Sequence, residues 1–227
     1  MLTNRKLIIF VSSVLIFFCA CKKNDPIVYP QNLKVVGFQN VKEPRLFAKQ
    51  GEIKDSKIVK RFVSVYDKSG YFSASKTYDY PSDFITFVSA DSVEVSLTEF
   101  PDRLAVERKD GYLFLLPKDS MTYIGDSFTD FLAIGKMKPG YKTYLIPMSS
   151  GYSKFVKARI PYICSGNEQE LVFPFLNALK LVKENSSYKG SVISDINNTF
   201  DESYVKTLGV SDTLLIQEYE LLFKNSQ

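Results

Sequence analysis

Histidine and tryptophan are both absent from this chain of 227 residues, and cysteine occurs only three times. Without histidine, the chain cannot form a histidine-dependent catalytic triad or a histidine zinc site, and it has no imidazole for acid-base chemistry. In contrast, 14 tyrosines and 18 phenylalanines are present, and such aromatic side chains suit the half-buried surfaces of β-sheets. The composition therefore excludes several classes of enzyme and favours a fold rich in strands.

Neither sign of charge is in clear excess. The chain holds 29 lysines and arginines and 25 aspartates and glutamates, which gives a formal net charge of +4. Two of the basic residues, Arg5 and Lys6, lie within the first 20 residues, so the rest of the chain has 27 basic minus 25 acidic residues, or +2. A balance this close to neutral gives no reason to expect a nucleic acid or a strongly acidic partner.

The N-terminus has the layout of a secretory signal peptide. A short basic start at Arg5 and Lys6 precedes a mostly apolar stretch from Leu7 to Ala20. This stretch has 14 residues, whereas a helix needs roughly 20 to cross a bilayer, so cleavage is expected rather than a permanent span. The small side chain of Ala20 places the cleavage directly before Cys21, and residues 1–20 are then the signal peptide.

The residues around this cleavage site, Phe18-Cys19-Ala20-Cys21, resemble the lipobox of bacterial lipoproteins. In that family the cysteine is acylated and becomes the mature N-terminus, so the resemblance implies a lipid anchor at Cys21. More than one acyl chain gives stable attachment, since each buried methylene contributes about 0.8 kcal/mol. The alternative is an ordinary signal peptide in which Cys21 has no special role.

The resemblance also bears on location. Residues 22–25, Lys-Lys-Asn-Asp, lack the acidic cluster that accompanies export to the outer face in some such lipoproteins. The resemblance therefore implies a protein anchored in the outer membrane that faces the periplasm rather than the cell surface.

Residues 21–31 are polar and contain Pro26 and Pro30, so we expect them to form a tether. Residues 32–227 show no second boundary and are expected to form a single β-rich domain. Within this domain Cys164 has no partner once Cys19 is removed and Cys21 is acylated. No internal disulfide and no cysteine-based metal site can then form.

Two short helices are expected in the domain. Asp55 is a good N-cap, and the apolar residues after it recur at helical spacing on one face: Ile58, Val59, Phe62, Val63 and Tyr66. Near the C-terminus, Asp201 caps a second short helix that ends at Gly209. The basic face of the first helix could bind phosphate, but a solvated surface is the simpler interpretation.

Most of the remaining chain alternates between apolar and polar residues, with turn residues about every ten positions, which is typical of β-sheet. Asp110-Gly111 tolerates the positive φ of a type I′ turn and predicts a hairpin. Pro139-Gly140 fits a type II turn and predicts a hairpin between residues 131–137 and 141–146.

The second half of the domain continues the alternation. A strand is expected over residues 155–164, with Cys164 pointing inward as a small apolar side chain. Residues 171–175 are a further strand, whereas 176–184 could be a helix or a strand. In the last strand, residues 214–223, we expect one apolar face and one wet face that carries Glu218 and Glu220.

The pattern predicts a mainly β fold: an antiparallel meander that closes as a barrel or folds as a two-sheet sandwich, with two short helices. This arrangement resembles the lipocalin-like domains of secreted lipoproteins from the Bacteroidota. The resembling segments are residues 45–53, which begin Arg-Leu-Phe, and residues 212–219, which begin Asp-Thr-Leu. Lipocalins proper carry a Gly-x-Trp motif that this chain lacks.

The sequence offers no catalytic constellation, so we expect no enzyme, no cofactor and no metal. Glu218 and Glu220 could pair as glycosidase carboxylates, but their position on a wet face favours a solvent role. The oxygen-rich stretch 195–201 lacks the glycine and distal glutamate of a calcium loop, and Ser127 has no base. An aromatic cluster could line a pocket or pack in the core: Tyr66, Tyr71, Phe72, Tyr78, Tyr80 and Phe84.

Two functions remain open. The first is a lipid-anchored binding module that holds an apolar or amphipathic small molecule in the mouth of a barrel. The second is an interaction lipoprotein that docks onto an envelope protein. A cavity lined by aliphatic and aromatic residues would favour the first, and a filled interior beside an exposed apolar patch would favour the second.

Three short motifs resemble the O-glycosylation acceptor of exported Bacteroidota proteins, in which Asp is followed by Ser or Thr and an aliphatic residue. They are centred on Ser92, Ser120 and Thr213. Each falls at an expected turn or strand edge, where a bulky glycan could be held in water. Ser120 is the preferred site, because it follows Pro117 in a connection between strands.

Overall fold

The computed structural model describes residues 27–73, 76, 82–96, 102–119, 121–124, 134–136, 145–150, 153–158, 161–184, 187–195 and 199–225. These residues form a mainly β structure built around a closed barrel of eight antiparallel strands, with two short helices. The mainly β prediction is confirmed, and of its two forms the structure adopts the barrel rather than the sandwich. No helix among the described residues is long and apolar enough to cross a membrane.

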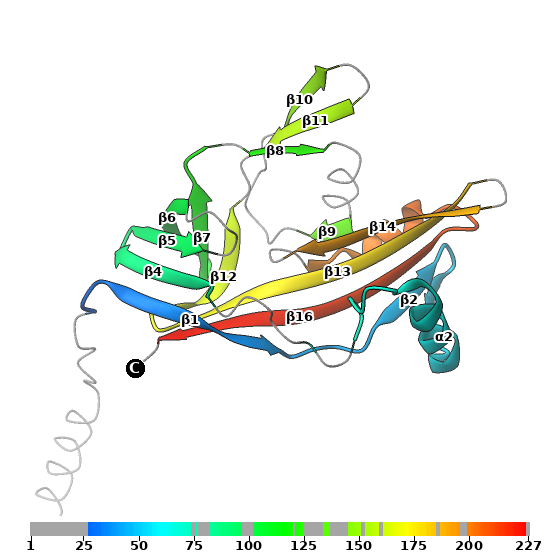
Figure 1. Ribbon diagram of the computed structural model, residues 1–227, viewed down its shortest axis with the longest axis horizontal. Helices are drawn as coiled ribbons and strands as arrows, with labels where there is room; N and C mark the ends of the chain where they lie inside the picture. The colour runs from blue at the N-terminus through cyan, green and yellow to red at the C-terminus, as the bar shows by residue number, and fades with distance from the viewer. Residues whose placement is uncertain are drawn as a thin grey trace, which may run out of the picture.

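The barrel is an up-and-down meander in which strands follow one another around the ring in chain order (Figure 1). Its strands are β1 (Gln31–Gln39), β4 (Phe84–Ser89), β5 (Ser92–Ser96), β6 (Asp102–Lys109), β7 (Tyr112–Pro117), β12 (Tyr162–Asn167), β13 (Glu170–Glu184) and β16 (Thr213–Asn225). The last strand pairs with both β1 and β13, and these two pairings close the ring. Closure removes the exposed edges that an open sheet would present.

The two ends of the barrel differ. At one end the strands are joined by tight turns, and the chain enters β1 there beside the end of β16. One of these turns is the predicted type I′ hairpin, in which Asp110 has φ 52° and Gly111 has φ 79°. The three long connections all leave from the opposite end. We call the end with the tight turns the turn end, and the opposite end the loop end.

The interior of the barrel is filled by side chains from all eight strands, which form one core cluster. Its buried members are Leu33, Ile85, Phe87, Val93, Val95, Leu104, Val106, Leu113, Leu115, Cys164, Leu171, Phe173, Leu221 and Phe223. Cys164 is fully buried and its thiol donates to the Leu113 carbonyl at 3.7 Å, which confirms its predicted inward direction. Each large apolar side chain that leaves water in this way contributes about 1.5 to 3 kcal/mol.

Beyond the loop end, β13 and β16 continue as a ribbon that is widened into a five-stranded sheet, which we call the wing. The wing adds β14 (Ser187–Asp195) beside β13, and β2 (Arg45–Ala48) and β3 (Gly51–Ile53) beside β16. Figure 1 shows the wing extending away from the barrel along the two long strands. Residues 176–184 are therefore strand, continuous with residues 171–175, and the helical alternative is wrong.

The helix α2 (Ser56–Tyr66) covers one face of the wing. Asp55 caps it as predicted, since its carboxylate accepts from the backbone N–H of Lys57 at 2.8 Å and of Ile58 at 3.4 Å. The cluster beneath it holds Leu46, Phe72, Leu179, Leu181 and Leu215, against which Ile53, Val59, Phe62 and Val63 are half-buried. No residue of α2 is fully buried, so the helix rests on the wing rather than within it.

The opposite face of the wing is covered by the 3-10 helix η1 (Glu202–Thr207), with Asp201 as its predicted N-cap. Tyr204 and Val205 from η1 pack there with β13 and β16 side chains. Both faces of the first half of β16 are therefore buried, and Leu214, Leu215, Ile216 and Gln217 are all inaccessible. The prediction of one wet face fails at these residues because a helix covers each side of the sheet.

Two smaller sheets complete the structure. One contains β8 (Met121–Ile124), β10 (Leu145–Ser150) and β11 (Ser153–Ala158), and the other contains β9 (Gly135–Lys136) and β15 (Thr199–Phe200). The turn predicted at Pro139-Gly140 lies outside the described residues, but the described parts of its two predicted strands do not pair with each other, because β9 pairs with β15 and β10 pairs with β11. The predicted single strand 155–164 is divided between β11 and β12, which lie in different sheets.

Candidate functional site

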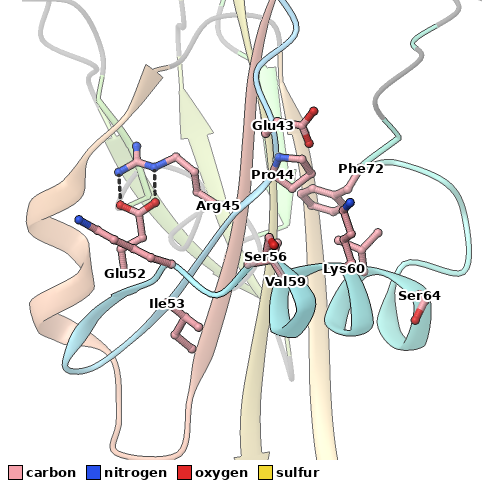
Figure 2. A pocket seen from close by; sticks show the side chains of 12 residues that line it. Glu43, Pro44, Arg45, Glu52, Ile53, Ser56, Val59, Lys60, Ser64 and Phe72 are labelled. Atoms are coloured by element: carbon pink, nitrogen blue, oxygen red, sulfur yellow. Dashed lines mark hydrogen bonds and ion pairs between the residues drawn. The ribbon is translucent and has the colours of Figure 1, made fainter.

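A groove of about 660 Å³ lies between α2 and the strands β2 and β3. We call it the α2 groove. Figure 2 shows α2 along one side of it and the β2–β3 turn along the other. Its lining residues are Glu43, Pro44, Arg45, Glu52, Ile53, Lys54, Ser56, Val59, Lys60, Val63, Ser64 and Phe72. The volume is within the range of about 300 to 1,000 Å³ typical of small-molecule sites.

The middle of the groove is apolar. Ile53 comes from β3, Val59 and Val63 come from successive turns of α2, and Pro44 and Phe72 lie at one end. Phe72 is only 2% exposed and belongs to the core cluster below α2, so it forms a fixed part of the wall. Because Val59 and Val63 are half-buried against the same cluster, an apolar ligand in the groove would cover the surface that they still expose.

Charged side chains surround this apolar surface. Arg45 donates from Nε and Nη2 to the two carboxylate oxygens of Glu52 at 3.2 and 3.1 Å, and to Glu202 of η1 at 2.7 Å. The hydrogen bonds to Glu52 are the main cause that raises the pKa of Arg45, and the same bonds lower the pKa of Glu52. This bidentate contact fixes the end of the groove and joins the β2–β3 hairpin to η1.

Three other charged residues line the groove without an ion-pair partner among the described residues: Lys54, Lys60 and Glu43. Lysine ammonium groups are strongly hydrated and mobile, so they can meet the head of a bound amphiphile at little structural cost. An apolar middle with cationic side chains at the rim suits a ligand that has an apolar body and an anionic group.

A second cluster lies where the barrel meets the wing, and we call it the junction cluster. Phe175 stacks on Tyr219 with ring centroids 4.6 Å apart, and Phe38 meets both rings edge-on. The Tyr219 hydroxyl donates to Asn177 Oδ1 at 3.0 Å, while Asn177 Nδ2 donates to the Tyr71 carbonyl at 2.5 Å. Lys76 Nζ lies 4.9 Å from the Tyr219 ring centroid and also donates to the Tyr71 carbonyl.

The junction cluster holds the segment after α2 against the sheet. Buried Gln217 donates from Nε2 to the carbonyls of Lys42 at 3.0 Å and Ser73 at 3.2 Å, so it joins the β1–β2 loop to the segment that follows α2. These contacts satisfy backbone carbonyls that the sheet leaves without partners. The cluster therefore positions α2, and with it one wall of the α2 groove.

We expect Lys76 to make the stability of the protein depend on pH. Burial lowers the pKa of Lys76 to about 8 from its ordinary value of 10.5. The unfolded chain then binds more protons than the folded one between these values, so this group raises stability as pH increases above about 8. Lys76→Met should be more stable than the parent near pH 7, and its stability should not show this increase above about pH 8.

Urea unfolding at about pH 7 and pH 9.5 measures the effect. Lys57→Met, on the exposed face of α2, is the matched control and should keep the pH dependence of the parent. A parent and a Lys76→Met variant with the same change in unfolding free energy between the two pH values would contradict the assignment.

The structure places two of the four residues predicted as attachment or modification sites. Ser92 is the first residue of β5, half-buried beside the turn at residues 90–91. Thr213 is the first residue of β16, and its hydroxyl oxygen is buried without a hydrogen-bond partner in the described part of the chain. A glycan is therefore easier to attach to folded protein at Ser92 than at Thr213. Cys21 and Ser120 lie outside the described residues.

The other residues weighed for chemistry have structural contacts. Glu218 accepts from Lys42 Nζ at 3.2 Å and from the backbone N–H of Phe200 at 3.2 Å. Glu220 accepts from Gln39 at 3.1 Å and Asn40 at 2.6 Å. These carboxylates therefore tie β1 and the loop after it to β16. Ser127 lies outside the described residues, as do residues 196–198 of the oxygen-rich stretch.

The α2 groove was not predicted from the sequence. Phe72 belongs to the aromatic cluster weighed above as a pocket lining, and it does line the groove. Of the remaining members, Tyr78 and Tyr80 lie outside the described residues, Tyr66 and Tyr71 are exposed, and Phe84 is half-buried at the start of β4. The available signal was the apolar stripe of α2, but the stripe does not reveal that Val59 and Val63 line a groove as well as packing against the core.

Comparison with known proteins supplies no relative. No family model matches the chain, and no curated protein and no solved structure is significantly similar to it. The function must therefore be argued from the geometry of the protein itself.

Proposed function

We propose that this protein is a lipid-anchored protein of the cell envelope that binds an amphipathic small molecule in the α2 groove. The observation that carries the proposal is the groove itself: about 660 Å³, apolar in its middle and lined by Lys54 and Lys60. Transfer of apolar surface from water into such a groove contributes about 25 cal/mol per Å² buried. The lysines supply a Coulombic preference for an anionic head group.

The position of the site differs from the sequence-based expectation. We expected a ligand in the mouth of the barrel, but the barrel interior is occupied by its own core cluster. Large residues such as Phe87, Phe173 and Phe223 are fully buried there. The α2 groove, outside the barrel and on the wing, is the better site.

The proposed anchor is compatible with this site. Chain entry at β1 lies at the turn end of the barrel, whereas α2 belongs to a connection that leaves from the loop end. An acylated Cys21 would therefore attach the turn end to the membrane and leave the groove open to the periplasm. Outer-membrane attachment facing the periplasm, and O-glycosylation at Ser92, Ser120 or Thr213, remain part of the proposal.

A second candidate function is docking of an envelope protein. Apolar side chains around α2 and β14 are exposed in the folded chain: Ile58, Val65, Tyr66, Tyr188 and Val192. A filled barrel beside exposed apolar residues is the arrangement that favours an interaction protein. A ligand that co-purifies and leaves when the groove is filled would decide for the small molecule.

Filling the groove is expected to abolish ligand binding without unfolding the protein. Ser56 lines the groove at the first position of α2, where its side chain is exposed, so Ser56→Trp should occupy the groove. Titration with 1-anilinonaphthalene-8-sulfonate, which has an apolar body and an anionic head, measures the effect. We expect binding to weaken at least about tenfold, which is about 1.4 kcal/mol.

Lys57→Trp is the matched control, because Lys57 is the adjacent exposed residue of α2 and does not line the groove. This variant should bind the dye as the parent does. Equal weakening in both variants, or in neither, would rule out the groove as the dye-binding site. Native mass spectrometry of the parent and of Ser56→Trp, purified from the same host, then reports whether a natural ligand is bound to the parent and missing from the variant.

A further inference from the structure

The side chains that α2 contributes to the α2 groove form two parallel rows. Val59 and Val63 are four residues apart, are half-buried, and belong to the floor of the groove. Ser56, Lys60 and Ser64 are also spaced by four residues, are exposed, and form the rim on the helix side (Figure 2). From Ser56 to Ser64 a helix rises about 12 Å, at about 1.5 Å per residue. The groove therefore follows the helix axis for about 12 Å.

Polar side chains also form the rim on the strand side of the groove. Glu43, Glu52 and Lys54 are all exposed there. Ile53 and Phe72 pack with the core cluster below α2, so they belong to the floor. Because both rims are exposed, the groove is open to water along its length, and a ligand that lies in it is buried on one side only.

Burial on one side favours a ligand that has one apolar face and one polar face. An alkyl chain on the floor would leave its outer side in water, so it would gain only part of the free energy that full burial provides. A rigid ring body with one polar face keeps that face hydrated, and its hydroxyl groups can bond to Ser56 and Ser64. It also loses less conformational entropy on binding.

The width of the groove leads to the same preference. A volume of about 660 Å³ along about 12 Å of helix gives a mean cross-section of roughly 55 Å². This cross-section is broader than a single extended alkyl chain and is wide enough for a flat system of fused rings.

The charges of the groove favour an anion whose acidic group lies at the β3 end. Lys54 directly follows β3 and has no ion-pair partner among the described residues. Arg45, which lines the same end, is already held by Glu52 and Glu202. Lys54 is therefore the cation that an acidic group can meet there without breaking a contact, while Lys60 stands midway along the helix-side rim.

From the two polar rims, the apolar floor and Lys54 we propose that the α2 groove binds a rigid, facially amphipathic anion. Such a molecule has a flat ring body with one apolar face, hydroxyl groups on the other face and an acidic group at one end. Its apolar face lies on Ile53, Val59 and Val63, its hydroxyl groups point to water and the rims, and its acidic group meets Lys54. This inference rests on the proposed function, since it names the class of molecule that the groove holds.

Competition between two anions of different shape tests the class. Cholate carries hydroxyl groups on one face of a rigid ring body and a carboxylate at one end, whereas decanoate carries the same charge on a flexible chain. Each is added, below its critical micelle concentration, to protein that has bound 1-anilinonaphthalene-8-sulfonate. We expect cholate to displace the dye at a concentration at least about tenfold lower than decanoate requires.

The orientation of the polar face is tested at the rim. Lys60→Leu makes the middle of the helix-side rim apolar, so hydroxyl groups there lose a partner. Lithocholate has the same ring body as cholate but fewer hydroxyl groups. In this variant the ratio of cholate affinity to lithocholate affinity should fall at least about fivefold. Lys57→Leu is the matched control, because it removes the same charge from α2 at an exposed residue that does not line the groove, and it should keep the parental ratio.

The outcomes separate this inference from the proposed function. If Ser56→Trp abolishes dye binding, yet decanoate competes as well as cholate or neither competes, the ligand class is wrong and the groove remains a site for another amphiphile. Dye binding that is unchanged in Ser56→Trp would contradict the proposed function itself. An unchanged affinity ratio in Lys60→Leu would overturn the placement of the polar face against the rim.

Discussion

Removal of Thr213–Gln227 is expected to abolish cooperative folding altogether. β16 pairs with β1, β13 and β2, so its loss opens the barrel and detaches both edges of the wing from one another. It also removes seven buried apolar side chains, five of them from the three core clusters: Leu214, Leu215, Ile216, Leu221 and Phe223 from the clusters, and Tyr219 and Leu222 besides. At about 1.5 to 3 kcal/mol for each buried side chain, the loss of about 10 to 20 kcal/mol matches or exceeds a typical domain stability of roughly 5 to 15 kcal/mol.

Thermal unfolding followed by near-ultraviolet circular dichroism measures this effect. The matched control ends at Asn225 and lacks only the two residues beyond β16, so it should melt as the parent does. A truncated protein that still melts cooperatively near the parental temperature would show that the barrel can close without β16.

The replacement Cys21→Ser is expected to move the protein from the membrane fraction to the soluble fraction completely. Acyl chains are attached through the thiol, and a hydroxyl at this position cannot accept them in the lipoprotein pathway that the lipobox resembles. Without the chains, the +2 charge of residues 21–227 gives too little attraction to hold the protein at a membrane surface.

Fractionation of host cells, with metabolic labelling by a fatty acid, measures this prediction. Cys19→Ser is the matched control, because Cys19 lies in the segment expected to be removed, and this variant should stay labelled and membrane-bound. Firm membrane retention of Cys21→Ser would show that Cys21 is not the anchor.

Local features of the fold were predictable because they depend on neighbouring residues. The type I′ turn at Asp110-Gly111 requires positive φ at both positions, and these are residue types that tolerate it. The caps at Asp55 and Asp201 are likewise short-range, since each carboxylate accepts from backbone N–H groups two or three residues further on.

Pairing between distant strands was less predictable. Pro139-Gly140 is a sound turn signal, yet β9 pairs with β15, which lies more than 60 residues further along the chain. Similarly, residues 155–164 keep one alternation pattern although the chain leaves one sheet after Ala158 and joins another at Tyr162. Alternation indicates which side chains share a face, but it carries no information about the neighbouring strand.

The sequence by itself determined a mainly β domain with two capped helices, an inward Cys164 and the absence of histidine-dependent chemistry. These follow from composition, from period-two patterning and from contacts within a few residues. Only the tertiary structure decided that the meander closes between β13 and β16, that its interior is filled, and that α2 leaves a groove beside β2 and β3. The physical reason is that closure and cavities depend on how side chains from distant segments fill a shared volume, and no local pattern specifies that fit.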